Sequence, residues 1–250
     1  MRRLLRFILP STKLFTGLLR LGQSTALLLP ASLKKKIPPR RAVTLWPTDS
    51  KATRTMLILE GCAQPATSPN TNAATARVLS RLGIAVVRAE RAGCCGAVSH
   101  HLSAHEEALI AMRRNIDAWW PYIEEGIEAI VISASGCGAM IKDYGYILRD
   151  DTDYKEKAHQ VSMMAKDVGE IIIAEEVETL GKMVKANSRR IVFQNPCSLQ
   201  HGQKIKDEVE DLFRKLGYQV DNIEDANQCC GSAGTYSLLQ TELSEKLRRK

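Results

Sequence analysis

The sequence predicts an α/β fold of two tandem related halves, each a series of strand, loop and helix with a parallel sheet, preceded by a basic helical arm. Apolar runs of strand length alternate with amphipathic helical stripes, which is typical of strand-helix-strand units. The pattern Cys-x31-Cys-Cys-Gly also occurs twice, starting at Cys62 and at Cys197, and such a repeat indicates an internal duplication. We therefore expect a basic helical arm and linker over 1–48, a first cysteine-rich half over 49–186 and a second, incomplete half over 187–250.

The positive charge of the chain is concentrated at its N-terminus. The formal net charge is +7, and the first 48 residues hold ten Lys or Arg side chains and no Asp or Glu. The remaining residues carry 25 basic and 28 acidic side chains, and only 5% of the 250 residues are aromatic. A nucleic-acid-binding domain needs a basic surface on its folded body, so we expect no nucleic acid partner.

Residues 1–30 are expected to form one or two short basic amphipathic helices, with Ser11 as an N-cap. Charged side chains interrupt every apolar run far short of the roughly 18 residues of a membrane span, and they break the apolar region that a signal peptide needs. Three interpretations stay open: an organellar transit peptide, a helix that docks on a membrane surface or partner, and an ordinary packed or solvated helix. Pro38 and Pro39 indicate a linker over 34–41.

The first half is expected to contain three buried strands separated by helices. Each expected strand is a short apolar run, and the first ends at Gly61-Cys62. The expected elements are a strand over 56–59, a helix over about 72–82, a strand over 84–87, a helix with the apolar stripe Leu102, Leu109, Met112, Ile116 and Trp119 that ends at Pro121, and a strand over 129–132.

The cysteines of this half all follow expected strands. Cys62 follows the first strand, Cys94-Cys95-Gly96 lies in a loop after the second, and Cys137 lies in a loop over 133–138 after the third. The carboxyl ends of parallel strands meet at one edge of a sheet, where ligands generally bind. We expect the four thiols to meet there.

Residues 153–185 are expected to be helical, and the spacing favours a helix over a strand even at Ile171-Ile172-Ile173. The second copy then follows the order of the first. Its expected elements are a strand over 191–193, the Cys197 loop, a helix with Ile205, Val209, Leu212, Phe213 and Leu216, a strand over 218–220, the Cys229-Cys230-Gly231 loop, and a final helix with Leu239, Leu243 and Leu247. This copy stops before the equivalent of Cys137.

The spacing of the cysteines points to metal chemistry. Core packing gives no reason for the repeated pattern. Adjacent Cα atoms lie about 3.8 Å apart, below the roughly 4.4 Å of a relaxed disulfide, and an odd number of cysteines also argues against a disulfide framework. Thiolates bind zinc, cuprous copper or iron-sulfur clusters. The candidate metal and cofactor ligands are Cys62, Cys94, Cys95, Cys137, Cys197, Cys229 and Cys230.

A cluster of the four-iron type is favoured over zinc. Such a cluster usually takes four thiolates, and the first half supplies four while the second supplies three. Structural zinc sites usually use closely spaced Cys-x2-4-Cys pairs, and the sequence contains none. Among the histidines, His105 is expected in the core, and surface or loop roles are favoured for His100, His101 and His201 over hydrogen bonds to sulfur.

At these residues the chain resembles the cysteine-rich CCG domain family. Members of this family include the cysteine-rich subunit of heterodisulfide reductase, the iron-sulfur proteins of anaerobic glycerol-3-phosphate dehydrogenase and lactate utilisation, and the iron-sulfur subunit of glycolate oxidase. The stretches 133–145, 195–203 and 229–236 are most similar to the last of these. The resemblance implies a [4Fe-4S] cluster in an electron-transfer subunit that is not catalytic alone.

The resemblance also implies partners and a location. It implies electron transfer from flavin-containing subunits that oxidise glycolate to glyoxylate, toward a membrane surface or quinone-side acceptor, with a cytoplasmic position peripheral to the inner membrane. Family members begin with a ferredoxin-like segment of two Cys-x2-Cys-x2-Cys-x3-Cys-Pro runs, which this sequence lacks, so we expect a partial chain. Ala134 also stands where some relatives have a further cysteine.

Three alternative functions stay open. The chain could be a zinc-stabilised docking module with no redox function, or the iron-sulfur subunit of a related lactate or glycerol-3-phosphate dehydrogenase. It could also be a thiol-disulfide enzyme that uses one of the adjacent cysteines as its reactive thiolate.

Overall fold

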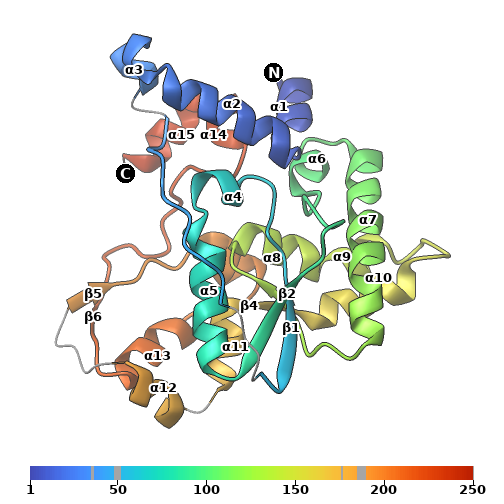
Figure 1. The fold of residues 1–250 in the computed structure, drawn as a ribbon. Coiled ribbons are helices and arrows are strands. Elements are labelled where there is room, and N and C mark those ends of the chain that lie inside the picture. Colours follow the sequence, from blue (N-terminus) through green and yellow to red (C-terminus); the bar gives the residue numbers. More distant parts are fainter. Residues whose placement is uncertain (35–36, 48–51, 176, 185–189, 250) are drawn as a thin grey trace.

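A four-stranded parallel sheet forms the centre of the molecule, with the strand order β2-β1-β3-β4 (Figure 1). The computed structural model describes residues 1–34, 37–47, 52–175, 177–184 and 190–249. The strands are β1 (Arg54–Ile58), β2 (Ile84–Arg88), β3 (Ile130–Ile132) and β4 (Ala165–Asp167). The mixed α/β fold with parallel strands is thus confirmed, and β1, β2 and β3 match the three expected apolar runs.

Helices connect these strands on both faces of the sheet. They are α4 (Gln64–Thr67) and α5 (Asn70–Arg81) after β1, α6 (Ala97–His101) and α7 (His105–Glu124) after β2, α8 (Ser135–Lys142), α9 (Tyr144–Ile147) and α10 (Lys155–Met164) after β3, and α11 (Val168–Ala174) and α12 (Val177–Met183) after β4.

Alternating side chains of the strands form two cores. Leu57 and Ile132 pack on one face with apolar residues of α7, α8 and α10. Met56, Ile58 and Val131 pack on the other face with apolar residues of α5 and α11. Successive side chains of a strand point to opposite faces, so apolar residues at every position bury both faces. The sheet is therefore fixed inside the molecule, and its carboxyl edge is a rigid support for the loops that follow it.

The expectation of a continuous helical region over 153–185 is wrong at β4. Residues 165–167 leave the helical path and pair in parallel with 130–132 of β3, with Ala165 and Asp167 buried and Lys166 exposed between them. Sheet pairing here overrides the helical spacing of the neighbouring apolar residues. Asp167 then begins α11 with a capping box that includes Glu170, and the helix expected at residues 171–173 is confirmed.

Two further boundaries differ from the expectation. Helix α7 does not end at Pro121 but continues to Glu124, because the carbonyl of Pro121 still accepts a hydrogen bond from the amide of Glu125 at 3.0 Å. Proline removes only its own donor and leaves its acceptor. Cys137 lies in the first turn of α8 rather than in a loop, since its amide already donates to the carbonyl of Ala134 at 2.9 Å.

The second copy of the repeat forms a smaller unit beside the main sheet (Figure 1). Its elements are β5 (Arg190–Val192), a π-helical turn η2 (Ser198–Gly202), α13 (Glu208–Lys215), β6 (Gln219–Asp221), α14 (Tyr236–Leu239) and α15 (Thr241–Arg248). Strands β5 and β6 pair in parallel, as β1 and β2 do. In each copy a glycine with positive φ, Gly83 at 74° and Gly217 at 86°, follows the helix and leads into the next strand.

Two helices of the second copy are shorter than expected. Helix α13 starts at Glu208 and so leaves out Ile205, whose amide instead donates a hydrogen bond to the carbonyl of Leu199 at 3.1 Å. The expected final helix is divided at Gln240 into α14 and α15.

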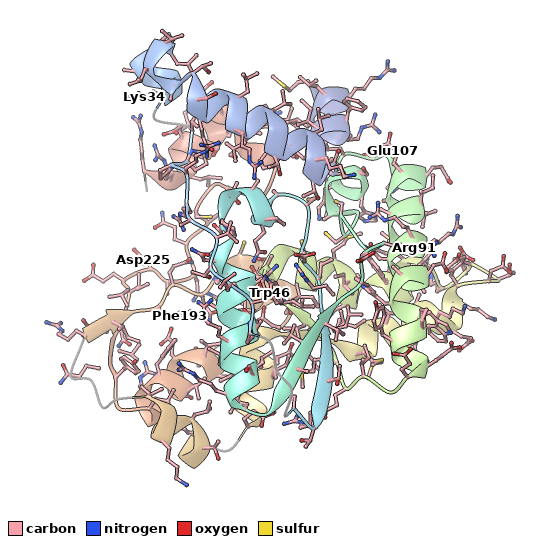
Figure 2. All side chains as sticks on the ribbon, in the orientation of Figure 1. Lys34, Trp46, Arg91, Glu107, Phe193 and Asp225 are labelled. Carbon is pink, nitrogen blue, oxygen red and sulfur yellow. The ribbon has the colours of Figure 1, made fainter. Side chains whose placement is uncertain are left out.

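The basic arm forms α1 (Arg2–Ile8), α2 (Thr12–Ser24), a 3-10 turn η1 (Ala26–Leu28) and α3 (Ala31–Lys34). Ser11 caps α2 by accepting a hydrogen bond from the amide of Leu14 at 3.4 Å, which confirms the expected cap. Helix α2 lies above α4 in Figure 1. At one side of the arm, Arg6 of α1 pairs with Glu107 of α7 at 3.2 Å, and Lys34 lies on α3 at the other side (Figure 2).

The expected linker has no regular secondary structure over 37–41, and its residues 35 and 36 lie outside the described residues. Among the described residues, no helix is both long enough and apolar enough to cross a membrane.

Candidate metal centre

The four cysteines of the first half line one cavity of about 630 Å³. Cys62 follows β1, Cys94 and Cys95 follow β2, and Cys137 lies at the start of α8, which follows β3. Because β2, β1 and β3 are parallel neighbours, their carboxyl ends meet at one edge of the sheet. The structure therefore brings these four residues together as the sequence predicts.

The four sulfur atoms form a continuous chain of contacts. Cys62 interacts with Cys94, and Cys95 interacts with both Cys94 and Cys137. Cys94 and Cys95 are almost fully buried, and Cys62 and Cys137 are half-buried. All seven cysteines of the chain are free thiols.

These interactions shift the pKa values of the four thiols in opposite directions. Hydrogen bonds from Cys62 and Cys95 lower the pKa of Cys94 to about 3, and a hydrogen bond from Cys95 lowers the pKa of Cys137. The pKa of Cys62 is raised by its hydrogen bond to Cys94 and by burial, and the pKa of Cys95 by its hydrogen bonds to Cys137 and Cys94. Each thiol thus shifts the pKa of its neighbours, and a lowered pKa favours the thiolate form that metal ligation requires.

The backbone of the adjacent cysteines is held by residues that the sequence reasoning missed. Asn115 of α7 accepts a hydrogen bond from the amide of Gly93 at 2.9 Å and donates to the carbonyl of Cys94 at 3.0 Å. Tyr144 of α9 donates its hydroxyl hydrogen to the carbonyl of Cys95 at 2.8 Å. A polar Asn on the buried stripe of α7 is a sequence signal for such a role, whereas Tyr144 offers no comparable signal.

Gly96 closes this loop and starts α6. Its φ of 87° lies in the left-handed region, and a Cβ atom there would come within 3.1 Å of the carbonyl oxygen of Ala108 in α7. Only glycine fits this position without strain or displacement of α7. The glycine after the cysteine pair is therefore required by the backbone path of the loop.

The cysteines of the second copy are placed differently. Cys197 and Cys230 line the same cavity as the four cysteines of the first half, whereas Cys229 is not among the residues that line it. All three are exposed, and the amide of Gly231 donates to the sulfur of Cys229 at 3.4 Å. One cavity is thus lined by the four candidate ligands of the first half and by two of the three candidates of the second half.

Direct contacts join the two copies beside Cys137. The hydroxyls of Ser135 and Ser198 lie 2.7 Å apart, and the carboxamide of Gln203 donates to the carbonyl of Ser135 at 3.0 Å. Gly138 lies so close to this carboxamide that a side chain there would collide with it. These contacts join the two copies at the cavity that Cys197 and Cys230 share with the four cysteines of the first half.

Two histidines lie at the edge of the site. His101 and His201 line the cavity and are exposed, in keeping with their expected surface roles. Burial lowers the pKa of His100. His105 is also exposed, with its ring edge-on to that of His100 at 5.4 Å, so the expected core position of His105 is wrong. It begins α7, where its side chain extends beyond the apolar stripe.

The donor set fits a thiolate-bound metal centre. It consists of four sulfur atoms on three rigid segments, and sulfur ligands select soft metal ions and iron-sulfur clusters. Among the described residues, no three His, Cys, Asp or Glu side chains are arranged to hold a single metal ion.

Comparisons with known proteins identify the family of the chain. The sequence pattern of the cysteine-rich domain family CCG matches residues 56–142 and 191–250. The glycolate oxidase iron-sulfur subunit of Escherichia coli (strain K12) is 46% identical over 248 residues, which are 99% of this chain and 60% of that protein. The probable glycolate oxidase iron-sulfur subunit of Bacillus subtilis (strain 168) is 25% identical over 220 residues, 88% of this chain and 48% of that protein.

A further relative is named for lactate utilisation. The lactate utilization protein A of Bacillus licheniformis is 25% identical over 180 residues, which are 71% of this chain and 72% of that protein. The chain therefore spans about half to three fifths of the length of the two glycolate oxidase subunits.

Proposed function

The chain belongs to the cysteine-rich CCG domain family, and on this basis we propose that it is the iron-sulfur electron-transfer part of a glycolate oxidase complex. The observation that carries the proposal is the convergence of four thiols from three strand ends on one cavity. The 46% identity to the E. coli glycolate oxidase iron-sulfur subunit supports the choice of complex. The chain serves as a subunit of an oxidoreductase and contains no substrate chemistry of its own.

The proposed ligands of a [4Fe-4S] cluster are Cys62, Cys94, Cys95 and Cys137. When bound, the cluster supplies one-electron transfer. The residues of the chain hold the four sulfurs, lower the pKa of Cys94 and of Cys137, and shield Cys94 and Cys95 from solvent. Cys197, Cys229 and Cys230 are assigned to a second site of the same kind, for which this chain contains three thiols.

The proposed partners are a flavin subunit that oxidises glycolate to glyoxylate and an acceptor at the membrane surface. The name of the E. coli relative calls it a subunit, which supports the existence of partner chains. The proposed division into arm (1–48), first half (49–186) and second half (187–250) is supported by the family match, which stops at residue 142 and restarts at residue 191.

We propose that the arm faces the cytoplasmic side of the inner membrane. Phe7, Leu18 and Leu21 are exposed on α1 and α2. The sequence of the arm contains ten cationic and no acidic side chains. Exposed apolar groups next to cations are typical of helices that lie on anionic lipid surfaces.

A related complex that oxidises lactate is the second candidate. The observation in its favour is the similarity to lactate utilization protein A, at 25% identity. Co-purification with either flavoprotein, followed by reduction of the cluster with glycolate or lactate, distinguishes the two substrates.

The central experiment is anaerobic purification followed by iron and acid-labile sulfide analysis and visible spectroscopy. We expect both elements to be bound, with broad absorption at about 400 nm from thiolate-to-iron charge transfer. Cys137→Ser is expected to remove most of the signal. Its matched control, Cys229→Ser, changes an exposed thiol outside the cavity and is expected to keep the first cluster. Stoichiometric zinc in a colourless sample contradicts the proposal and supports a structural docking module.

A further inference from the structure

The loop that holds the adjacent cysteines is fixed mainly by side chains. Residues 92–95 lie between β2 and α6 without regular secondary structure. Three successive backbone groups of this loop, the amide of Gly93 and the carbonyls of Cys94 and Cys95, bond to side chains of α7 and α9. Buried backbone polar groups need partners, so these side chains determine where the two sulfurs can lie.

Asn115 and Tyr144 form the buried part of this support. Both side chains are fully buried, and the carboxamide of Asn115 donates to the hydroxyl oxygen of Tyr144 at 3.2 Å. Tyr144 in turn stacks against Trp119, with ring centroids 6.5 Å apart. The two polar groups are thus locked by each other and by the core, and they present a fixed pattern to Cys94 and Cys95.

Arg114 adds a positive charge to the same loop. Its guanidinium donates to the carbonyl of Cys94 at 2.9 Å and to the carboxamide oxygen of Asn115 at 3.3 Å. It also lies against Gly93, where a Cβ atom would come within 2.9 Å of a guanidinium nitrogen. Arginine remains protonated in proteins, so this charge is permanent.

We propose that Asn115 and Tyr144 are positioning residues for the adjacent cysteines, and that Arg114 is the cation that raises the reduction potential of the cluster they bind. The second part rests on the proposed function, because it needs a redox centre at these sulfurs. Reduction adds negative charge to a cluster, and a nearby cation stabilises the reduced form more than the oxidised form. This clamp, formed by Asn115, Tyr144 and Arg114, therefore both places the ligands and favours uptake of an electron at this site.

The test of the charge uses three variants of the iron-loaded protein in an anaerobic redox titration followed by visible and electron paramagnetic resonance spectra. Arg114→Gln is expected to shift the equilibrium toward the oxidised form by about tenfold, which is about 59 mV for one electron. Arg114→Lys keeps the charge and is expected to restore most of the potential. Arg113→Gln is the matched control, because Arg113 is the preceding residue of α7 and bonds to Asp151 at 2.8 Å. Equal potentials for Arg114→Gln and Arg113→Gln, or no recovery with lysine, overturn the role of Arg114.

The test of positioning uses the reduced, metal-free protein. The alkylation rates of Cys94 and Cys95 are measured by peptide mass spectrometry in the parent, in Tyr144→Phe and in Tyr154→Phe. Tyr154 bonds to Asp117 on an exposed surface and serves as the control. Tyr144→Phe is expected to raise labelling at the two cysteines by about tenfold, since loss of a buried hydrogen bond promotes local opening of the loop. Equal rates for the two tyrosine variants overturn the positioning role.

The two tests separate the failure of this inference from the failure of the proposed function. A parent protein that takes up no iron and sulfide refutes the proposed function and the role of Arg114 together. The labelling rates then still decide whether Tyr144 positions the two thiols.

Discussion

Replacing Asn115 by Ala removes the centre of the polar network behind the adjacent cysteines. The amide of Gly93 loses its acceptor at 2.9 Å, while the carbonyl of Cys94 keeps its hydrogen bond from Arg114. An unpaired, partly buried donor costs about 1–2 kcal/mol, and the space left by the fully buried carboxamide adds about 1 kcal/mol. We therefore expect the free energy of unfolding to fall by about 2–3 kcal/mol.

The assay is urea unfolding of the reduced, metal-free protein, followed by far-ultraviolet circular dichroism. Ile110→Ala is the control, because Ile110 is on the same helix and is 63% exposed, and its effect is expected within about 0.5 kcal/mol. If Asn115→Ala also stays within about 0.5 kcal/mol of the parent, the network does not hold the loop, and the reasoning is refuted.

Three further predictions concern the loop, the sheet edge and the arm. Gly96→Ala is expected to destabilise the protein by about 1–3 kcal/mol in thermal unfolding, because alanine is strained at a φ of 87° and its Cβ approaches the carbonyl of Ala108; an unchanged melting temperature contradicts this. Burial raises the pKa of the Asp167 carboxyl, so the fold binds its proton more tightly than the unfolded chain does. The parent therefore gains stability as the pH falls through this raised pKa toward the pKa of the unfolded chain. Asp167→Asn keeps an oxygen that can cap α11, and it is expected to be more stable than the parent at neutral pH. This difference in the free energy of unfolding is expected to shrink in acid. A stability difference between variant and parent that grows in acid contradicts this prediction. In flotation assays the double variant Leu18→Glu, Leu21→Glu is expected to lose most of its binding to anionic vesicles, and equal binding of parent and variant argues against the arm as the membrane face.

The sequence predicts the site of the first half well because the relevant signals are local. Each apolar run before Cys62, Cys94 and Cys137 identifies a buried parallel strand, and the geometry of such sheets brings their ends together. The repeat also predicts the parallel pairing of β5 and β6, since a duplicated pattern folds in the same way.

Other features depend on contacts between distant parts of the chain. Strand β4 has three residues and forms only because β3 offers an edge for pairing, so helical spacing conceals it. The common cavity of both copies depends on the contact of Ser135 with Ser198 and of Gln203 with the start of α8. The clamp on Cys94 and Cys95 joins residues about twenty and fifty positions apart, which no local pattern indicates.

The central claim is that four first-half thiolates hold one four-iron cluster. The direct measurement is the iron and sulfide content, with Mössbauer spectra, of an anaerobically purified triple variant Cys197→Ser, Cys229→Ser, Cys230→Ser. We predict that about four iron and four sulfide ions per chain remain, with the spectrum of a single four-iron cluster. Loss of the iron from this variant, with Cys62, Cys94, Cys95 and Cys137 intact, contradicts the claim.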